Sequence, residues 1–223
     1  MTRPALVASA RMKGPLARLG IRGLKPTLSK APERLARLLT PEGAPLPPNT
    51  LAELQRDMAR LRFIMEQIRE IEATRAARIE QHPEQPNHAM IVLLARVIGV
   101  GIETADMLVH EILSRPLRDR KAVARYAGLT GSPDESGARR REKGLAKAGN
   151  ARVRRGMIQL AWRFLMFQKQ SALVQWYQRQ TADARGGTRK TMIVALARKL
   201  LVALWRLVTT GEIPEGVVLR RAA

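Results

Sequence analysis

The sequence predicts a mainly α-helical protein, in which a helical stalk that forms a coiled coil precedes a compact helical domain. Two observations lead to this prediction. Residues 50–80 repeat apolar side chains at alternating spacings of three and four, which is the pattern of a coiled-coil helix. From about residue 89 onward helical patterns dominate, and only residues 128–148 have the Gly, Ser, Pro and charge content of a basic loop or short hairpin.

Composition limits the class of protein. The 223 residues are enough for one good core or two small units. Lys and Arg number 40 against 19 Asp and Glu, and the net charge of +21 predicts a polyanionic partner, either nucleic acid or an anionic membrane surface. A hydrophobic content of 45% excludes a disordered basic tail. The absence of cysteine excludes disulfides, thiolate metal sites and cysteine catalysis.

A membrane protein is not expected. The two longest apolar runs are interrupted by Arg96 and by Arg198 with Lys199, and both runs are too short to span a bilayer. No signal peptide is evident at the start of the sequence. We therefore expect a soluble, cytoplasmic protein of bacteria that associates with the nucleoid. A basic helical protein that binds the membrane surface is the weakest alternative, because the apolar helices are expected to be buried.

The first part of the chain is expected to be a segment that precedes the stalk. Residues 1–24 resemble a basic, Gly-punctuated helix, and residues 25–50 read as a linker with one short helix near 32–39. We expect residues 1–48 to be the remnant of a preceding domain together with this linker.

The stalk is expected at residues 49–82, capped at its start by Asn49 or Thr50. Two interpretations of its apolar seam stay open: the helix packs on its own domain, or it dimerises the protein as a coiled coil, and the second predicts a homo-oligomer. The seam consists of Leu51, Leu54, Met58, Leu61, Met65 and Ile68.

The C-terminal domain is expected at residues 89–219. Its first motif, Gly99-Val100-Gly101, lies between two apolar helical segments in the pattern of a helix-hairpin-helix. Glycines permit a tight turn, and the exposed amides of the second helix can bind a phosphate. The alternative is a hairpin of helices that only packs. Helices are expected at about 89–98, 102–114, 119–127, 150–170, 171–182 and 188–210.

The second motif is a cationic segment that runs from Ser136 to Arg155. It contains eight cationic residues and a single acid, Glu142, whereas a solvated surface normally alternates positive and negative charges. This imbalance predicts phosphate binding. Asn150 follows Gly149 and is well placed to cap the next helix, whose N-terminus also favours anions. The predicted nucleic-acid ligands are Arg139, Arg140, Arg141, Lys143, Lys147, Arg152, Arg154 and Arg155, with Asn150, Gly99 and Gly101.

Ser136 is the first candidate nucleophile, although a Ser-Gly pair in a loop is usually a turn. Its neighbouring acids are Asp134, Glu135 and Glu142, and no Ser-His-Asp pattern is visible. Tyr126 is a rival nucleophile, but its place at the end of an apolar helix favours packing.

The sequence raises two further classes of site, a metal site and a surface for base stacking. No set of acids forms a convincing metal site, because Glu103, Asp106 and Glu111 are spaced along a single helix. The aromatic residues fall in apolar helices, where core packing is expected and base stacking is the alternative; they are Trp162, Phe164, Phe167, Trp176, Tyr177 and Trp205.

Several motifs in a fixed order carry a resemblance. The hairpin glycines are followed by the turn "YAGL", the Ser-Gly pair, "KAGN" with an arginine four residues later, and a terminal helix "ALARKLLVALW". Together they cover about residues 90–219. In this combination the chain resembles the C-terminal half of the IS-one-ten (IS-eleven-eleven) insertion-sequence transposases, also called DEDD transposases or bridge-RNA-guided recombinases.

The resemblance implies an activity. In that family a RuvC-like domain with an acidic tetrad precedes a coiled coil and a serine-bearing domain, and the two halves form one active site. The resemblance makes Ser136 the nucleophile that forms a covalent bond to DNA, and it makes Arg139, Arg141, Lys147 and Arg152 phosphate ligands. It also implies a structured guide RNA, and Mg²⁺ only at the acidic half.

The acidic domain has no counterpart in this sequence, and the chain is expected to begin at its last helix. We therefore expect a transposase domain that is incomplete by itself and needs a partner that supplies the acidic half. The alternative is a non-catalytic, basic module that only binds nucleic acid.

Overall fold

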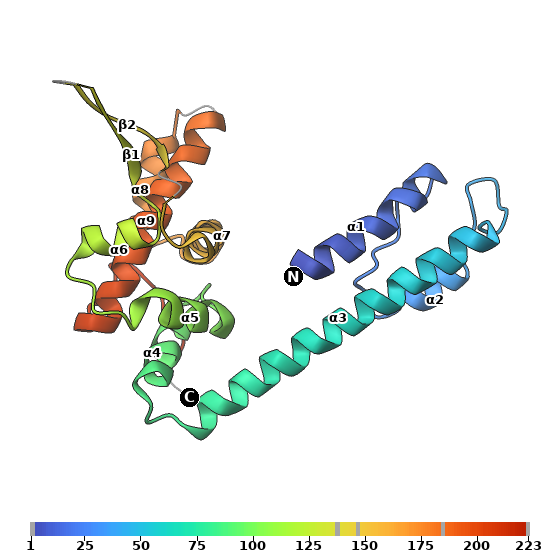
Figure 1. The fold of residues 1–223 in the computed structure, drawn as a ribbon, viewed down its shortest axis with the longest axis horizontal. Helices are drawn as coiled ribbons and strands as arrows, with labels where there is room; N and C mark the ends of the chain where they lie inside the picture. The colour runs from blue at the N-terminus through green and yellow to red at the C-terminus, as the bar shows by residue number, and fades with distance from the viewer. Residues whose placement is uncertain (1–2, 137–138, 146–147, 184–185, 222–223) are drawn as a thin grey trace. The chain divides into compact units, whose positions relative to one another are not determined.

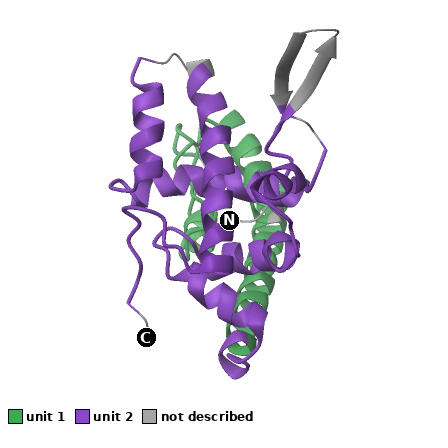
Figure 2. Cartoon of the chain, turned by 90° about the vertical axis from the view of Figure 1, so that its left-hand side faces the viewer, with its two compact units in different colours: residues 1–78 green, residues 79–223 purple. Residues whose placement is uncertain are grey.

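The computed structural model describes residues 3–136, 139–145, 148–183 and 186–221; for residues 3–4, 132–136, 139–144 and 186–187 it describes the backbone alone. The protein is mainly helical, as the sequence predicts. It divides into two compact units, residues 1–78 and residues 79–223, which Figure 2 colours separately.

Among the residues that the structure describes, three helices build the first unit. Helix α1 spans Arg3–Arg18, α2 spans Ala31–Ala36, and α3 spans Pro48–Gln81, so that its last residues belong to the second unit (Figure 1). All three helices contribute to one core. Its buried side chains include Met12, Leu16, Leu24, Leu35, Leu46, Leu54, Met58 and Leu61.

The N-terminal half of the predicted stalk seam is used inside this unit. Leu54, Met58 and Leu61 are buried in its core, while Met65 and Ile68 are half-buried at its edge. Beyond the core, apolar side chains of α3 such as Ile71 are exposed. The first interpretation of the seam, packing on its own domain, therefore describes its beginning, and the coiled coil stays a prediction for the remainder.

The start of α3 differs from the sequence prediction. The expectation that Asn49 or Thr50 caps the helix is wrong, because α3 begins at Pro48 and both residues lie within its first turn. Proline suits this position, since its fixed φ is already helical and its missing N–H would have no partner in the first turn. Residues 1–48, expected as remnant and linker, share a core with α3.

In the part of the chain that the structure describes, the second unit contains six α-helices beyond the end of α3, one π-helix and a hairpin. Helices α5 and η1 run together as one segment whose second part is a π-helix, so the predicted helix 102–114 is formed with a change of pitch. The irregular segment 128–148 contains a two-stranded antiparallel hairpin. The elements are α4 (Pro86–Ala95), α5 (Ile102–Leu108), η1 (Val109–Leu113), α6 (Arg120–Tyr126), β1 (Gly131–Ser136), β2 (Arg139–Leu145), α7 (Ala151–Phe167), α8 (Ala172–Thr181) and α9 (Gly186–Thr210).

Helix α9 is central to this unit and packs against α4, α6, α7 and α8 (Figure 1). Its apolar residues follow helical spacing, with Leu196, Leu200, Leu204 and Leu207 buried on one side. Arg198 and Lys199, which interrupt the apolar run, are exposed. In the part of the chain that the structure describes, no helix combines the length and apolar character that a membrane crossing needs.

Candidate nucleic-acid interface

Two glycines form the base of the hairpin. Gly128 and Gly149 have φ values of +63° and +91°, which only glycine adopts without strain. A Cβ on Gly149 would lie 2.7 Å from the amide nitrogen of Gly128 and 2.7 Å from the carbonyl oxygen of Tyr126. The amide of Asn150 donates to the same oxygen over 2.7 Å. The two ends of the hairpin segment therefore meet in a backbone contact that admits no side chain.

The register of the hairpin sets Ser136 at its far end. Ser136 is the last residue of β1 and pairs with Arg139, the first residue of β2, while Gly131 and Leu145 pair at the near end. The one irregularity of the ladder lies between Gly131 and Ser132, so the register from Ser132 onward is regular.

Alternation along the strands sorts the charged residues of the hairpin between two faces. Residues directly opposite each other share a face, and successive residues alternate. The Ser136 face holds the three cations Arg139, Arg141 and Lys143 with one acid, Asp134. The other face holds one cation, Arg140, with two acids, Glu135 and Glu142. Of the predicted ligands in the hairpin, Arg140 alone is thus separated from Ser136.

The N-terminus of α7 is capped as the sequence predicts. The side-chain oxygen of Asn150 accepts from the amides of Arg152 (2.9 Å) and Val153 (3.1 Å). This contact satisfies two of the amides that a helix start leaves without an intrahelical partner. The prediction of the cap is confirmed.

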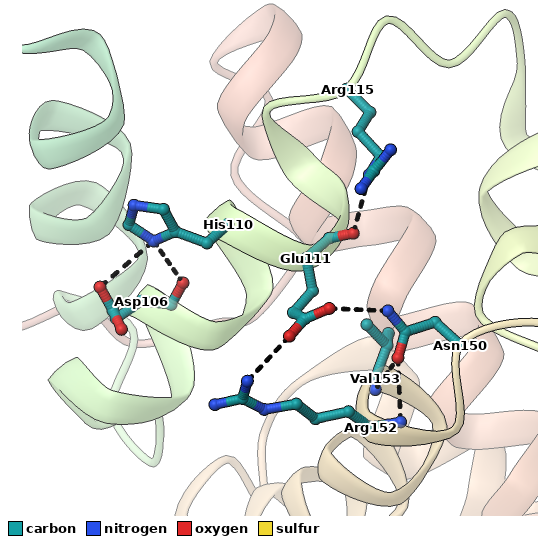
Figure 3. A network of polar contacts seen from close by, with 7 residues as sticks. All are labelled: Asp106, His110, Glu111, Arg115, Asn150, Arg152 and Val153. Carbon is teal, nitrogen blue, oxygen red and sulfur yellow. Dashed lines mark hydrogen bonds and ion pairs between the residues drawn. The ribbon is translucent and has the colours of Figure 1, made fainter.

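A carboxylate holds this cap in place (Figure 3). Glu111 accepts from Nδ2 of Asn150 through Oε2 (2.8 Å) and from Nη1 of Arg152 through Oε1 (2.9 Å). Glu111 lies in the π-helix η1, whose wider turn changes the direction in which its side chains point. From the sequence, Glu111 reads as an ordinary acid on a helix, because its partners follow some 40 residues later and no local pattern indicates them.

The two other predicted ligands in α7, Arg154 and Arg155, lie beside backbone carbonyls. Nη1 of Arg154 donates to the carbonyl of Ala148 over 3.3 Å, and Nε of Arg155 donates to Ala151 over 3.2 Å. These contacts use one donor of each guanidinium, which has five. Arg155 is exposed and Arg154 is half-buried, so both can reach a phosphate from this helix turn. Lys147, a further predicted ligand, lies outside the described residues.

The turn between α4 and α5 is tightly fixed. Gly99 has a φ of +98°, as the tight turn requires, and a Cβ there would lie 3.4 Å from the Cβ of Phe167. Gly101 has an extended backbone with a φ of −90°, which any residue adopts. The carboxylate of Glu103 lies 3.7 Å from the Cβ position of Gly101, at the start of α5.

A buried glutamine and the C-terminal segment brace this turn. Nε2 of Gln168 donates to the carbonyls of Ile98 (2.7 Å) and Val218 (2.9 Å), and its Oε1 accepts from the amide of Val218 (2.9 Å). The amide of Ile98 also donates to Val218 over 3.2 Å. The turn therefore has a packing role, and its predicted phosphate contact stays a prediction.

Tyr126, the rival nucleophile, lies against the core and not in the hairpin that carries Ser136. It is half-buried against the core, and the guanidinium of Arg115 lies 4.9 Å from the centre of its ring.

Among the described residues, no group of three or more His, Asp and Glu could hold a metal ion.

The expectation that all six aromatic residues pack in the core is wrong for two of them. Phe164 and Tyr177 are buried and Trp176 and Trp205 pack against the core, but Trp162 and Phe167 are about half exposed. Helix α7 has apolar residues on more than one side, and the sequence does not tell which side the neighbouring helices cover.

Comparison with known proteins identifies the segment that carries these features. Residues 92–178, from α4 to α8, match the model of the Transposase IS116/IS110/IS902 family. Residues 92–178 carry the domain of this transposase family. The matched segment of the transposase domain includes the hairpin, Glu111 and the whole of α7. The resemblance to this transposase family is confirmed.

A relative extends the likeness beyond the family segment. The protein named "Putative transposase y4rJ" of Sinorhizobium fredii (strain NBRC 101917 / NGR234) is 39% identical over 220 residues. The aligned region is 94% of this chain and 55% of the relative, so the chain spans about half the length of the curated relative it matches.

Proposed function

We propose that the chain is the strand-exchange part of an insertion-sequence DNA transposase, in which Ser136 forms a covalent bond to DNA. The observation that carries this proposal is the register of the hairpin, which pairs Ser136 with Arg139 within the segment of the family match. A hydroxyl nucleophile that acts on a phosphodiester needs cations beside it, because the attacked phosphate gains negative charge in the transition state.

The proposed step conserves the number of phosphate ester bonds. Oγ of Ser136 forms a bond to phosphorus, and the bond from that phosphorus to one deoxyribose oxygen breaks. The hydroxyl proton passes to a base, and the leaving oxygen takes up a proton. Asp134 is the one acid on the Ser136 face and is the proposed acceptor. Attack of a second strand's hydroxyl on the phosphoserine then releases the serine and joins the strands.

The cations divide into two groups in this proposal. Arg139 and Arg141 stabilise the charge at the reacting phosphate, because they share the face of Ser136. Arg154 and Arg155, together with the capped start of α7, bind neighbouring phosphates and position the DNA. The contribution of Arg152 depends on its release from Glu111.

Two further parts of the proposal come from the resemblance: a structured guide RNA selects the DNA sites, and an acidic domain supplies the Mg²⁺ chemistry. A third part comes from the apolar seam of the stalk, through whose exposed part in α3 the chain forms homo-oligomers. The described residues do not fit a metal ion by themselves, so no step above depends on one.

The test is a search for a covalent adduct. The chain is incubated with nicked or junction DNA of the element, an intact relative that supplies the acidic domain, and that relative's RNA. A labelled DNA strand that stays on the protein through denaturing electrophoresis is expected for the wild type. It should be lost in Ser136→Ala and retained in Tyr126→Phe.

Two outcomes would contradict the proposal. An adduct that survives Ser136→Ala and disappears in Tyr126→Phe would transfer the role to the tyrosine. Salt-sensitive DNA binding without any adduct would favour the alternative function, a non-catalytic module that binds nucleic acid.

A further inference from the structure

One face of α7 is exposed along its whole length and changes character from cationic to aromatic. Its residues recur at spacings of three and four, which places them on one side of the helix. Trp162 is 47% and Met166 is 65% exposed. From the N-terminal end, this face consists of Arg152, Arg155, Gln159, Trp162 and Met166.

Trp162 differs from the other two tryptophans of the protein. Trp176 packs against the core, and the ammonium of Lys199 lies 4.6 Å from the centre of its ring. Trp205 also packs against the core. The indole of Trp162 is left about half accessible on a regular helix, where it offers a flat aromatic face to a partner.

The surroundings of Trp162 indicate the chemistry of that partner. Helix α7 contains no acidic residue, and its exposed face begins with two arginines. A rise of 1.5 Å per residue sets Trp162 about 10 Å along the helix axis from Arg155. That distance corresponds to about three stacked nucleotides at 3.4 Å each. Phosphates beside the arginines would thus leave a base within reach of the indole.

We propose that Trp162 is a stacking platform for an unpaired base of a single-stranded nucleic acid, whose phosphates follow Arg152 and Arg155. Every base has a π face, so such a platform binds strands with little regard to sequence. The base must be unpaired, because a base inside a duplex has both faces covered by its neighbours. The proposal shares with the proposed function the binding of nucleic acid, and it does not depend on the Ser136 reaction.

The experiment compares binding of the full chain to single-stranded DNA, single-stranded RNA and blunt duplex DNA of one sequence. Trp162→Ala should weaken binding to the single strands by about 5- to 100-fold, the range expected for one lost base–aromatic stack. Binding to the duplex should change less than about 2-fold. Trp162→Phe should keep most of the single-strand affinity, and Met166→Ala on the same face is the matched control. A larger loss on RNA than on DNA would identify RNA as the natural strand.

Tryptophan fluorescence gives an independent measurement on the wild-type protein. Stacking should quench the exposed indole when a single strand binds, and the quenching should be absent in Trp162→Phe, which retains Trp176 and Trp205. Thermal unfolding of each variant verifies that the fold is intact.

Several outcomes would overturn the stacking site without affecting the Ser136 proposal. One is an unchanged single-strand affinity of Trp162→Ala together with unquenched wild-type fluorescence. Another is a change of oligomeric state in Trp162→Ala with unchanged nucleic-acid binding, which would make this face a protein contact. Conversely, loss of the covalent adduct in every condition, with single-strand quenching retained, would remove the proposed reaction and leave the stacking site in place.

Discussion

Oε1 of Glu111 lies 2.9 Å from Nη1 of Arg152, and this ion pair joins the π-helix η1 to the first turn of α7 (Figure 3). The arginine is a predicted phosphate ligand, and its side chain is 67% exposed. In the proposed function, Glu111 and a DNA phosphate therefore compete for the same guanidinium. The carboxylate would lower the positive charge that α7 offers to DNA, at the end of the helix that adjoins the hairpin.

Glu111→Gln should strengthen DNA binding. The amide still accepts from Asn150 but carries no charge, so Arg152 becomes available to one more phosphate. The slope of log K against log salt should become steeper by about 0.9, the value for one added phosphate contact on duplex DNA. The loss of stability should stay below about 1 kcal/mol, because the arginine partner of this ion pair is well exposed. Fluorescence anisotropy between 50 and 200 mM salt measures the slope.

The double variant Glu111→Gln, Arg152→Gln is the control for this prediction. It should return to the wild-type slope, because the gain depends on the freed guanidinium. A Glu111→Gln protein that binds more weakly, with an unchanged slope, would show that the carboxylate only supports the fold.

Arg139→Gln and Arg140→Gln should differ in their effect on the covalent adduct. The two arginines are adjacent in the sequence, but Arg139 pairs with Ser136 and Arg140 pairs with Glu135 on the other face. Arg139→Gln should slow adduct formation by roughly 100-fold, as expected for the loss of one preorganised donor at a developing charge. Arg140→Gln removes the same charge and should slow it by less than about 5-fold. Equal losses would contradict the sorting of the cations by register.

Gly149→Ala should destabilise the second unit more than Gly211→Ala does. Both glycines have a positive φ, +91° and +75°, so each substitution bears the strain of a left-handed backbone, about 1–2 kcal/mol. Only at Gly149 does the new Cβ meet backbone atoms closer than 3.0 Å, whereas nothing lies within 4 Å at Gly211. The crowding should add about 1–3 kcal/mol.

Urea unfolding followed by tryptophan fluorescence measures this difference in the second unit, because Trp162, Trp176 and Trp205 all lie there. A similar loss of unfolding free energy in both variants would show that the backbone around Gly128 and Gly149 shifts to admit a Cβ at little cost in free energy.

Asp119 should make the stability of the second unit depend on pH in the acid range. Its carboxylate accepts from the amide of Ala122 (2.8 Å), which lowers its pKa below the usual 3.8, and nearby Arg118 acts in the same direction. The contribution of the carboxylate is therefore present above about pH 3.8 and is lost as the pH falls through the lower folded-state value. Asp119→Asn, which retains a capping oxygen, should flatten the slope of unfolding free energy between pH 5 and pH 3.

A pH series of urea unfolding curves for the wild type and Asp119→Asn checks this expectation. Parallel slopes in the two proteins would exclude a contribution from this cap. Asp134→Asn is not a suitable comparison, because that residue belongs to the proposed reaction.

The sequence predicts those features of this protein that depend on neighbouring residues. Helical periodicity placed the helices of the second unit within a few residues, because the apolar spacing of a helix is a local property. The Asn150 cap was predictable for the same reason, since its partners lie two and three residues further on. The order of short motifs between residues 90 and 219 led to the family that comparison then confirmed.

Only the tertiary structure decided which groups meet across long separations. Glu111 reaches Asn150 and Arg152 because α5 changes into a π-helix before it and because α7 packs close to this segment. Trp162 is exposed because α9 and α5 cover the other sides of α7. The register that sets Arg139 opposite Ser136 depends on how two strands align. A single sequence gives each helix its apolar residues and each hairpin its turn, but packing selects which side is buried and which charges become partners.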